Sequence, residues 1–369
     1  MLLMKIEREQ LLRPLQSVSG IVEKRHTLPI LSNVLIDIEG DALTLLATDI
    51  EIQIRTRSTG SISAAQPASL TVAARKLQDI LRALPEGQEV SLDADERKLT
   101  VRAGKSRFTL QTLPAQDYPR MQLADGETTK ISLSQKTLKR LLSLVQYSMA
   151  QQDIRYYLNG LLLSVGDEEM RLVATDGHRL AFVSEPLPGV TGKLDVILPR
   201  KTVLELARQL ADIDDPVDIE LGANQARLRF GSVELITKLI DGKFPDYERV
   251  IPKDHPKELL LQRATFLPAL QRAAILTNEK FKGVRVVLSA GTLKLISSNA
   301  EQEEAVEELE VDYSGEGLDI GFNVSYLLDV LNNVSGDTLS LRLNDGNSSA
   351  LITLPGTDAF KYVVMPMRV

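Results

Sequence analysis

The sequence predicts an α+β fold made of three tandem copies of one domain, each with two helices against a mostly antiparallel sheet. A helix pattern, a hairpin pattern and a second helix pattern recur in that order in each third of the chain. The motif Leu-Val-Ala-Thr-Asp at 172–176 also has near copies at 45–49 and 295–299. A motif that recurs at such a spacing indicates a repeated fold unit first and a functional site only second. A chain of 369 residues is long enough for two or three domains with their own cores.

The first expected helix of each repeat has apolar residues three and four positions apart, which is the spacing of one buried helix face. The segments and their apolar residues are 7–19 with Leu11, Leu12, Leu15 and Val18, 134–148 with Leu138, Leu141, Leu142 and Val145, and 262–277 with Phe266, Leu267, Leu270 and Ala273. Pro14 and Pro268 fall inside two of these helices, so we expect irregular first turns there. The second helices are expected at 74–84, 199–211 and 323–333, with Pro199 at a first helical position and Ser134 and Asn323 as N-caps.

A hairpin is predicted after each first helix, because β-branched and apolar runs there are separated by turn residues. The paired runs are 34–38 with 42–46, 161–165 with 170–174, and 284–288 with 292–296. Further strands are expected at 98–103, 227–230 and 350–354. Polar stretches near residues 125 and 255 have the composition of linkers, so we expect domains at 1–125, 126–255 and 256–369.

The composition excludes several classes of protein. The chain has no cysteine, which rules out disulfides, thiolate metal sites and thiol nucleophiles. No segment approaches the roughly 18 consecutive apolar residues of a membrane span, and the N-terminal residues become charged too soon for a secretory signal. We therefore expect a cytoplasmic protein that does not associate with membranes and that needs no cofactor or metal.

The charge is unevenly distributed along the chain. The net charge of −7 argues against a nucleic-acid partner. Four of the six expected helices nevertheless carry an excess of two or three Lys and Arg residues, namely 74–84, 134–148, 199–211 and 262–277. A basic helix layer would attract phosphates without reading sequence. The alternative is that these long side chains only solvate the exposed helix faces.

The two ends of the chain carry opposite charges. A run of glutamates occupies 301–310, whereas Phe108 and Leu110 lie among Lys76, Arg102, Lys105 and Arg107. Such opposite ends suggest that copies associate head to tail. The copies close into a ring if the rotation between neighbours returns to the first copy, and otherwise they form a filament. The alternative for the glutamate run is a solvated acidic strand.

An enzyme and a protein scaffold that does not bind DNA are the two alternatives to a DNA-binding protein. Asp176 beside His178 suggests a general base or a metal site, and Glu301, Glu303 and Glu304 could hold magnesium in a phosphoryl-transfer enzyme. The chain has no Gly-rich phosphate loop, HExxH motif or nucleophile elbow, and its histidines lie apart at His26, His178 and His255. A repeat scaffold that binds proteins but no DNA is the other alternative, and the basic helices count against it.

Eight short motifs are distributed along nearly the whole chain. They are TLPIL at 27–31, QDIRYYLNG at 152–160, ATDGHRL at 174–180, PRK at 199–201, FPDY at 244–247, NEKF at 278–281, EQEEA at 301–305 and VVMPMR at 363–368. Together they resemble the bacterial DNA polymerase III beta subunits, the sliding clamps. The resemblance implies a homodimeric ring, joined head to tail and lined by helices, that encircles duplex DNA without sequence specificity. It implies an accessory subunit of a DNA polymerase rather than an enzyme.

The resemblance also implies the partners and the residues that meet them. The partners are duplex DNA and the primer–template junction, the alpha-type subunit of the replicative polymerase, the clamp loader, and other polymerases and repair proteins that carry short linear peptides. The residues implied to bind DNA are Arg25, Gln152, Tyr156, Tyr157, Arg200 and Lys201. The tyrosines could stack on bases or pack on sugars, although at least one could instead pack on the sheet.

Two protein interfaces are implied in the same way. The dimer interface pairs Lys76, Arg107, Phe108 and Leu110 of one protomer with Ile275, Leu276, Glu301, Glu303 and Glu304 of the other. The family usually has an arginine at the position of Lys105. The lysine keeps the positive charge but lacks the bidentate fork of a guanidinium. The peptide-binding groove is implied at Thr175, Gly177, His178, Arg179, Leu180, Pro245, Arg249, Val250, Val363, Val364, Met365, Pro366, Met367 and Arg368. Adaptable methionines suit apolar peptide anchors, whereas the alternative for the last residues is an edge strand that ends the third sheet.

Overall fold

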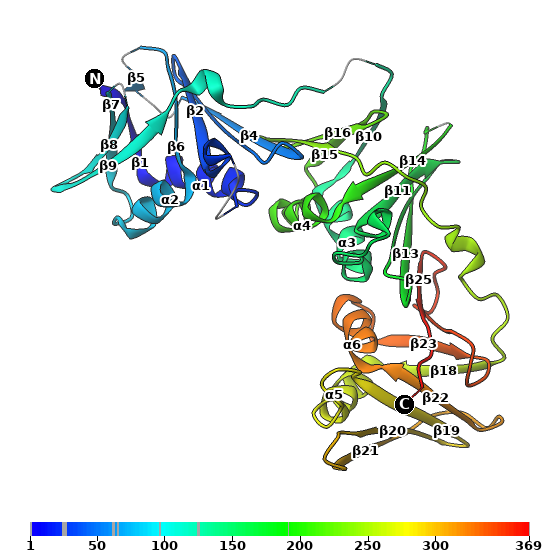
Figure 1. The fold of residues 1–369 in the computed structure, drawn as a ribbon. Coiled ribbons are helices and arrows are strands. Elements are labelled where there is room, and N and C mark those ends of the chain that lie inside the picture. Colours follow the sequence, from blue (N-terminus) through cyan, green and yellow to red (C-terminus); the bar gives the residue numbers. More distant parts are fainter. Residues whose placement is uncertain are drawn as a thin grey trace. The chain divides into compact units, whose positions relative to one another are not determined.

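The computed structural model describes residues 2–23, 28–60, 63–64, 66–95, 97–123, 126–190 and 192–368. Within these ranges the chain forms six α-helices and 25 strands, and every sheet ladder is antiparallel (Figure 1). The chain divides into two compact units, one of residues 1–139 and 204–239 and the other of residues 140–203 and 240–369. The α+β class and the order of helices and hairpins predicted from the sequence are confirmed.

The first repeat begins with strand β1 (Leu2–Glu7) and helix α1 (Arg8–Ser19). The remaining elements of this repeat are β2 (Asn33–Glu39), β3 (Ala42–Thr48), β4 (Ile52–Thr59), β5 (Ser63–Ala64), β6 (Ala68–Ala73), α2 (Ala74–Ala83), β7 (Glu89–Asp95), β8 (Lys98–Ala103) and β9 (Ser106–Leu113). Helix α1 packs against α2 and against strands β3 and β4. Its apolar face at Leu11, Leu12, Leu15 and Val18 is buried, as the spacing predicts.

The second repeat has the same order of elements except that it has no counterpart of the short strand β5 among the described residues. Its elements are β10 (Thr129–Ser134), α3 (Gln135–Val145), β11 (Gly160–Gly166), β12 (Glu169–Thr175), β13 (Arg179–Pro186), β14 (Lys193–Pro199), α4 (Arg200–Gln209), β15 (Pro216–Leu221), β16 (Gln225–Phe230) and β17 (Val233–Lys238). Ser134 caps α3, since its Oγ accepts a hydrogen bond from the Thr137 amide at 3.1 Å. Pro199 ends β14 and precedes α4, so its predicted place at the first helical position is wrong by one residue.

The third repeat runs from β18 (Lys257–Gln262) to the C-terminal strand. Its other elements are α5 (Arg263–Ala274), β19 (Gly283–Ser289), β20 (Thr292–Ser298), β21 (Glu304–Glu310), β22 (Leu318–Asn323), α6 (Val324–Asn333), β23 (Thr338–Leu343), β24 (Ala350–Thr353) and β25 (Phe360–Val364). Helices α5 and α6 pack side by side, as α1 and α2 do (Figure 1). The Asn323 side chain caps α6 by accepting a hydrogen bond from the Ser325 amide at 2.9 Å. Pro14 and Pro268 lie inside continuous helices, so the prediction of irregular first turns in these helices is wrong.

Two strand pairs join consecutive repeats into continuous sheets. In the first unit β17 pairs with β4, from Val233 opposite Thr56 to Thr237 opposite Ile52. In the second unit β13 pairs with β25, from Arg179 opposite Val364 to Val183 opposite Phe360. Each pair adds backbone hydrogen bonds and buried side chains across a repeat junction. The elements of the central repeat are therefore shared between two sheets, one of 13 strands and one of eight in the described ranges.

The junction strand β25 corrects one expectation about the end of the chain. The sequence left open that the last residues form an edge strand of the third sheet. Strand β25 is instead internal, because it pairs with β13 on one side and with β24 on the other. A segment that is paired on both sides is held rigidly, so it can support a binding surface rather than only end a sheet.

Candidate functional site

The recurring Ala-Thr-Asp motif forms the same turn in the first two repeats. The Asp176 carboxylate accepts hydrogen bonds from the amides of His178 (2.9 Å) and Arg179 (3.1 Å). In the first repeat the Asp49 carboxylate accepts from the amides of Glu51 (3.0 Å) and Ile52 (2.9 Å). An aspartate that bonds its own backbone in this way shapes a turn. The motif is thus structural, and the possible catalytic role of Asp176 is not supported by this geometry.

The repeats differ at the residue after the aspartate. Gly177 has a φ of +88°, and a Cβ at this position would lie 3.0 Å from both terminal nitrogens of Arg155. The glycine therefore serves both a left-handed turn and the close approach of a guanidinium. In the first repeat Ile50 occupies the equivalent position with a φ of +71°. In the central repeat an arginine thus lies against this turn.

Beside this turn lies a largely apolar cavity of about 170 Å³. The residues that line it are Arg155, Leu158, Thr175, Gly177, Arg179, Leu180, Pro245, Tyr247, Val250, Val363 and Met365. They come from the segment before β11, from the ends of β12, β13 and β25, from the turn between β12 and β13, and from the segment that follows β17. A buried cluster that includes Leu180, Phe182, Phe244 and Val363 forms its base, with Tyr247 and Val250 packed on it. The cavity is small, apolar and preformed, as suits a single apolar side chain.

The cavity contains eight of the fourteen residues implied for the groove. Six do not line it: His178, Arg249, Val364, Pro366, Met367 and Arg368. Val364 is buried inside the sheet, and the Met367 amide bonds to the Gly321 carbonyl at 2.8 Å. Arg155, Leu158 and Tyr247 line the cavity although the sequence reasoning omitted them. Arg155 and Leu158 lie inside the motif QDIRYYLNG and Tyr247 inside FPDY, so these motifs could have identified them as residues of the site.

Arg179 is the most constrained charged residue at the cavity. Its side chain is only 10% exposed, and its Nη2 donates to the Tyr147 carbonyl at 2.6 Å. The guanidinium also lies over the Tyr326 ring, 4.4 Å from the centroid. Burial disfavours the charged form and would lower the pKa of Arg179. The interactions with Tyr362 and Asp329 outweigh this effect and hold the pKa of Arg179 above its usual value. Arg179 is therefore a fixed cation that positions the wall of the cavity.

A second, polar cavity of about 440 Å³ lies on the other side of the turn. Gln152 and Arg200, both implied to bind DNA, line it together with His178. Gln152 has a left-handed φ of +57°, and Arg200 donates from Nη1 to the Met149 carbonyl at 3.1 Å. Burial and the nearby Arg179 lower the pKa of Arg200 from its usual value. The structure thus brings Gln152 and Arg200 together, whereas Lys201 lies further along α4 and Arg25 falls outside the described residues.

The two tyrosines have different surroundings. Tyr156 is 57% exposed, whereas Tyr157 packs against the buried cluster under the cavity. Their rings meet edge to face with centroids 5.8 Å apart. One tyrosine therefore packs on the sheet, as the alternative interpretation expected, and the other is available to a ligand.

Four of the nine residues implied for the dimer interface lie on strands with an open edge, namely Arg107, Phe108 and Leu110 on β9 and Glu304 on β21. Strand β21 pairs with β20 alone among the described strands, and its glutamates Glu304, Glu308 and Glu310 are exposed. Strand β9 pairs with β8 along its length but with β6 only at Thr112 and Leu113, so the edge from Ser106 to Gln111 is open on one side. Arg107 of β9 and Lys76 of α2 are exposed, and Ile275, which follows α5, is 75% exposed. Open edges are templates for pairing with another chain.

The glutamates considered as a magnesium site do not come together as one in the part of the chain that the structure describes. No group of three or more His, Asp or Glu side chains there could hold a metal ion. Glu303 instead accepts a hydrogen bond from the Asn299 side chain at 2.5 Å, and Glu304 is an exposed residue of β21. Among the described helices none is long and apolar enough to cross a membrane.

Among the basic helix residues, Arg8 pairs with Glu9, and Arg75, Arg200 and Arg263 donate to backbone carbonyls. Two further groups can be distinguished. Arg140, Arg208 and Arg272 pair with Glu185, Glu205 and Glu307, respectively. Five others have no ion pair with any described residue, namely Arg13, Lys76, Arg82, Lys136 and Lys139. The charge excess that the sequence indicates is therefore partly neutralised within the chain, and the second group is what remains for an anionic partner.

Comparison with known proteins gives matches along nearly the whole chain. Family models described as the N-terminal, central and C-terminal domains of the DNA polymerase III beta subunit match residues 2–122, 132–246 and 248–368. A protein named beta sliding clamp from Pseudomonas putida is 50% identical over 98% of this chain and 99% of its own length. The Escherichia coli beta sliding clamp is 46% identical over the same shares. A crystal structure of a Pseudomonas aeruginosa sliding clamp bound to griselimycin has a TM-score of 0.95 at 48% identity and covers both chains completely.

Proposed function

The chain belongs to the DNA polymerase III beta subunit family, and from this membership we propose how it acts as a replication processivity factor. Two copies close head to tail into a ring around duplex DNA, and the ring tethers the replicative polymerase. Relatives at 46–50% identity are named as clamps and not as catalysts, so this chain is an accessory subunit rather than an enzyme. Tethering by a ring depends on topology, so the ring needs only weak, sequence-blind contacts with phosphates.

The domain boundaries proposed are near residues 125 and 255. Three consecutive family-model matches support a division into three domains. A cytoplasmic location is also proposed, because the similar proteins come from bacteria, in which the chromosome lies in the cytoplasm.

DNA contact is proposed for Gln152, Tyr156, Tyr157, Arg200 and Lys201, together with Arg25. Support comes from the polar cavity that Gln152 and Arg200 share and from the exposed ring of Tyr156. An exposed aromatic ring offers a stacking surface where single strand meets duplex. The unpaired basic residues of the helices would add phosphate contacts that weaken with salt.

The DNA proposal is tested by retention on nicked circular DNA before and after the circle is cut. The protein is loaded with its clamp loader at moderate salt and separated from free protein by gel filtration. Retention on circles and loss from linear DNA is the expected result, because a ring leaves DNA only over an end. Equal retention on both forms would refute the ring.

Partner binding is proposed at the apolar cavity beside Gly177, and this cavity is the observation that carries the proposal. A peptide anchor such as leucine would bury its side chain there, which contributes about 1.5–3 kcal/mol. Arg155 and Arg179 at the wall supply donors for the carbonyls or carboxylates of the bound peptide. The clamp loader, the polymerase and repair proteins are the partners proposed to present such peptides.

The groove proposal is tested with a fluorescein-labelled peptide that carries leucine and phenylalanine anchors. Met365→Ala should weaken binding by about tenfold, since a truncated central anchor contact costs more than 1 kcal/mol. Met367→Ala is the matched control, because Met367 has the same side chain but does not line the cavity. Fluorescence anisotropy measures both variants. Equal weakening by both, or by neither, would contradict the assignment of this cavity.

A further inference from the structure

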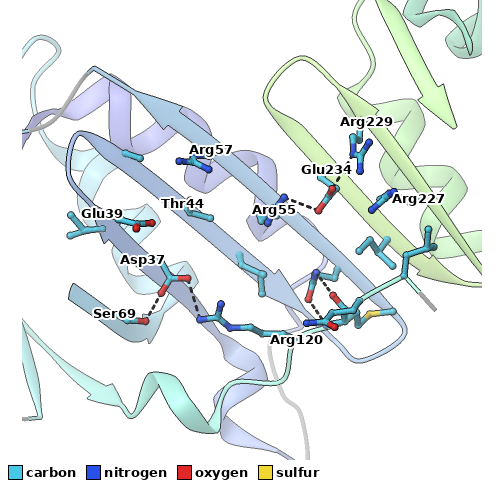
Figure 2. Close-up of a pocket in the computed structure, with 18 of the residues that line it drawn as sticks. Asp37, Glu39, Thr44, Arg55, Arg57, Ser69, Arg120, Arg227, Arg229 and Glu234 are labelled. Atoms are coloured by element: carbon cyan, nitrogen blue, oxygen red, sulfur yellow. Dashed lines mark hydrogen bonds and ion pairs between the residues drawn. The ribbon is translucent and has the colours of Figure 1, made fainter. Parts of the chain in front are cut away.

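The first unit contains a second, wider cavity at the equivalent repeat junction. It has a volume of about 980 Å³ and lies where β17 of the central repeat pairs with β4 of the first repeat (Figure 2). The groove beside Gly177 lies at the corresponding pair of β13 with β25. In both places the segment that follows the last strand of a repeat closes one side. These segments read Asp117-Tyr118-Pro119-Arg120 and Asp246-Tyr247-Glu248-Arg249.

The apolar part of this junction is already filled by the chain itself. Tyr118 is 4% exposed and packs against Leu35 and Leu46. Its hydroxyl donates to the Asn33 carbonyl at 2.9 Å. The Gln53 side chain holds the backbone of Met121 by two hydrogen bonds, of 2.7 and 3.1 Å. An apolar anchor therefore finds no open pocket here, in contrast to the groove beside Gly177.

What remains open is a surface rich in arginine. Five arginines line the cavity, against three carboxylates: Arg55, Arg57, Arg120, Arg227 and Arg229 against Asp37, Glu39 and Glu234. Arg120 lies in the segment that follows β9, and the other charged residues lie on β2, β4, β16 and β17, where the strand register places them on one face of the sheet. Helix α1 covers the other face, where it packs on β2, β3 and β4. The cavity thus faces away from the helix layer proposed to meet DNA.

Two of the three carboxylates of the cavity, Asp37 and Glu234, form ion pairs, but the arginines are not saturated. Glu234 bridges Arg55 and Arg229 at 3.1 Å each, and Asp37 accepts from Arg120 at 3.2 Å (Figure 2). Arg57 has no ion pair with any described residue, and no dashed line reaches it in Figure 2. The Nε of Arg227 is buried without a hydrogen-bond partner in the described structure. Arg227 and Arg229 also pair with Glu220 of β15. Of the five arginines, Arg57 is therefore the one whose guanidinium has no ion pair with a described residue and remains for a carboxylate of another chain.

We propose that this cavity binds an extended acidic peptide segment of a partner protein, with carboxylates on alternate residues. Arg55 and Arg57 lie two positions apart on one strand face, a spacing of about 6.6 Å at 3.3 Å per residue. An extended peptide presents its alternate side chains at the same spacing. A guanidinium can bind a carboxylate through two parallel hydrogen bonds. Arg55 and Arg229 already donate to the carboxylate of Glu234, so the arginines of this surface can bind carboxylates.

The lining favours a peptide over single-stranded nucleic acid. Sites for single strands combine basic residues with aromatic rings on which bases stack. No aromatic side chain is among the described residues that line this cavity. Asp37, Glu39 and Glu234 would also repel a continuous phosphate backbone, whereas a peptide can place its carboxylates between them.

The test uses the full chain and a fluorescein-labelled peptide of alternating aspartate and serine. Anisotropy is measured at an ionic strength of about 0.15 M, where the Debye length of about 8 Å screens distant charges. The same peptide with asparagine in place of aspartate, and a labelled oligothymidylate, are the comparison probes. We expect the aspartate peptide to bind and the asparagine peptide not to bind.

Arg57→Gln is the principal variant, because it removes a guanidinium that has no ion pair with any described residue. It should weaken binding of the aspartate peptide severalfold, and Arg55→Gln with Arg57→Gln should weaken it by about tenfold, which is about 1.4 kcal/mol. The double variant Lys193→Gln with Arg342→Gln removes the same charge from β14 and β23, outside the cavity, and should change affinity by less than about twofold. Thermal melts check that each variant is folded.

Three results would overturn the proposal. They are equal binding of the aspartate and asparagine peptides, equal weakening by the control variant, and tighter binding of the oligothymidylate that depends on the same two arginines. The last result would assign the cavity to nucleic acid. Because neither Arg55 nor Arg57 lines the groove beside Gly177, these outcomes are independent of the groove and ring proposals.

Discussion

Arg179 on β13 donates from Nη1 to Oδ2 of Asp329 on α6 at 2.5 Å, so a side chain of the central repeat is tied to a helix of the C-terminal repeat. The same guanidinium holds the Tyr147 carbonyl and the Asp176 carboxylate. Its planar fork satisfies three acceptors in different directions, which an ammonium at the end of a lysine cannot do. The wall of the groove beside Gly177 is thereby fixed from both repeats at once.

Arg179→Lys should lower the free energy of unfolding of the second unit by about 2 kcal/mol, since hydrogen bonds to charged groups contribute about 1.5–3 kcal/mol. The chain has no tryptophan, and Tyr147, Tyr326 and Tyr362 surround the guanidinium, so tyrosine fluorescence during urea unfolding reports on this region. Arg285→Lys is the matched control, because its pair with Asp319 is about half exposed on both sides and should change stability by less than about 1 kcal/mol. Equal losses in the two variants would argue against the bridging role.

Ile50→Asn should stabilise the first unit by about 1 kcal/mol, because a β-branched residue at a φ of +71° is strained and asparagine tolerates this conformation. Gly177→Asn, at the equivalent position, should instead destabilise the second unit. Its Cβ would lie 3.0 Å from the Arg155 nitrogens, so the arginine must move out of the cavity wall. Differential scanning calorimetry measures both changes, and a stabilising Gly177→Asn would contradict the close approach.

Tyr118→Phe should cost about 1–3 kcal/mol, because the lost hydroxyl leaves a buried carbonyl and a buried amide without that partner. The hydroxyl donates to the Asn33 carbonyl and accepts from the Thr48 amide at 3.3 Å. Burial also raises the pKa of Tyr118 above its usual value, so the group stays neutral at physiological pH. Tyr313→Phe, which loses an exposed hydrogen bond to the Glu316 carbonyl, should cost less than about 0.5 kcal/mol. Chemical denaturation compares the two.

The carboxyl of Asp153 should titrate at about pH 2, since its hydrogen bonds with the Arg155 side chain and amide hold its pKa at about 2, below the ordinary value of 3.8. A lowered folded-state pKa means that the stabilisation is present above pH 3.8 and is lost as the pH falls towards 2. Carbon-detected NMR of the aspartate carboxyls follows the titration. In Arg155→Gln the midpoint should return towards 3.8, and an unchanged midpoint in that variant would show that Arg155 is not the cause.

Glu303→Lys with Glu304→Lys should weaken the proposed dimer by at least about tenfold, because like charges would then face Lys76 and Arg107 of the other protomer. Sedimentation velocity across a concentration series measures the dissociation constant. Glu316→Lys with Asp358→Lys makes the same charge change at exposed positions outside β21 and serves as the control. An unchanged dimer in the first variant would refute the proposed interface.

The six helices and the three hairpins were predictable because each depends on local periodicity. The buried faces at Leu11 to Val18 and at Leu138 to Val145 follow from helical spacing alone. The ends of the elements were less certain, as Pro199 shows, since capping depends on the particular backbone at each end. Of the implied groove residues, Thr175, Leu180 and Val363 line the cavity, but Pro366 and Met367 do not, because adjacent residues of a chain point in different directions.

The sequence by itself determined the threefold repeat, the α+β class and the family, because periodicity and motifs survive without any coordinates. Only the tertiary structure decided which repeat junction is open to an apolar anchor. The two junctions share the sequence pattern Asp-Tyr-x-Arg, yet Tyr118 is buried in its own core while Tyr247 lies beside an open cavity. Whether the tyrosine side chain of this pattern fills the pocket at its junction depends on packing among strands that are distant in sequence. For the same reason Arg55, Arg57, Arg227 and Arg229 form one surface only after β4 and β17 have paired.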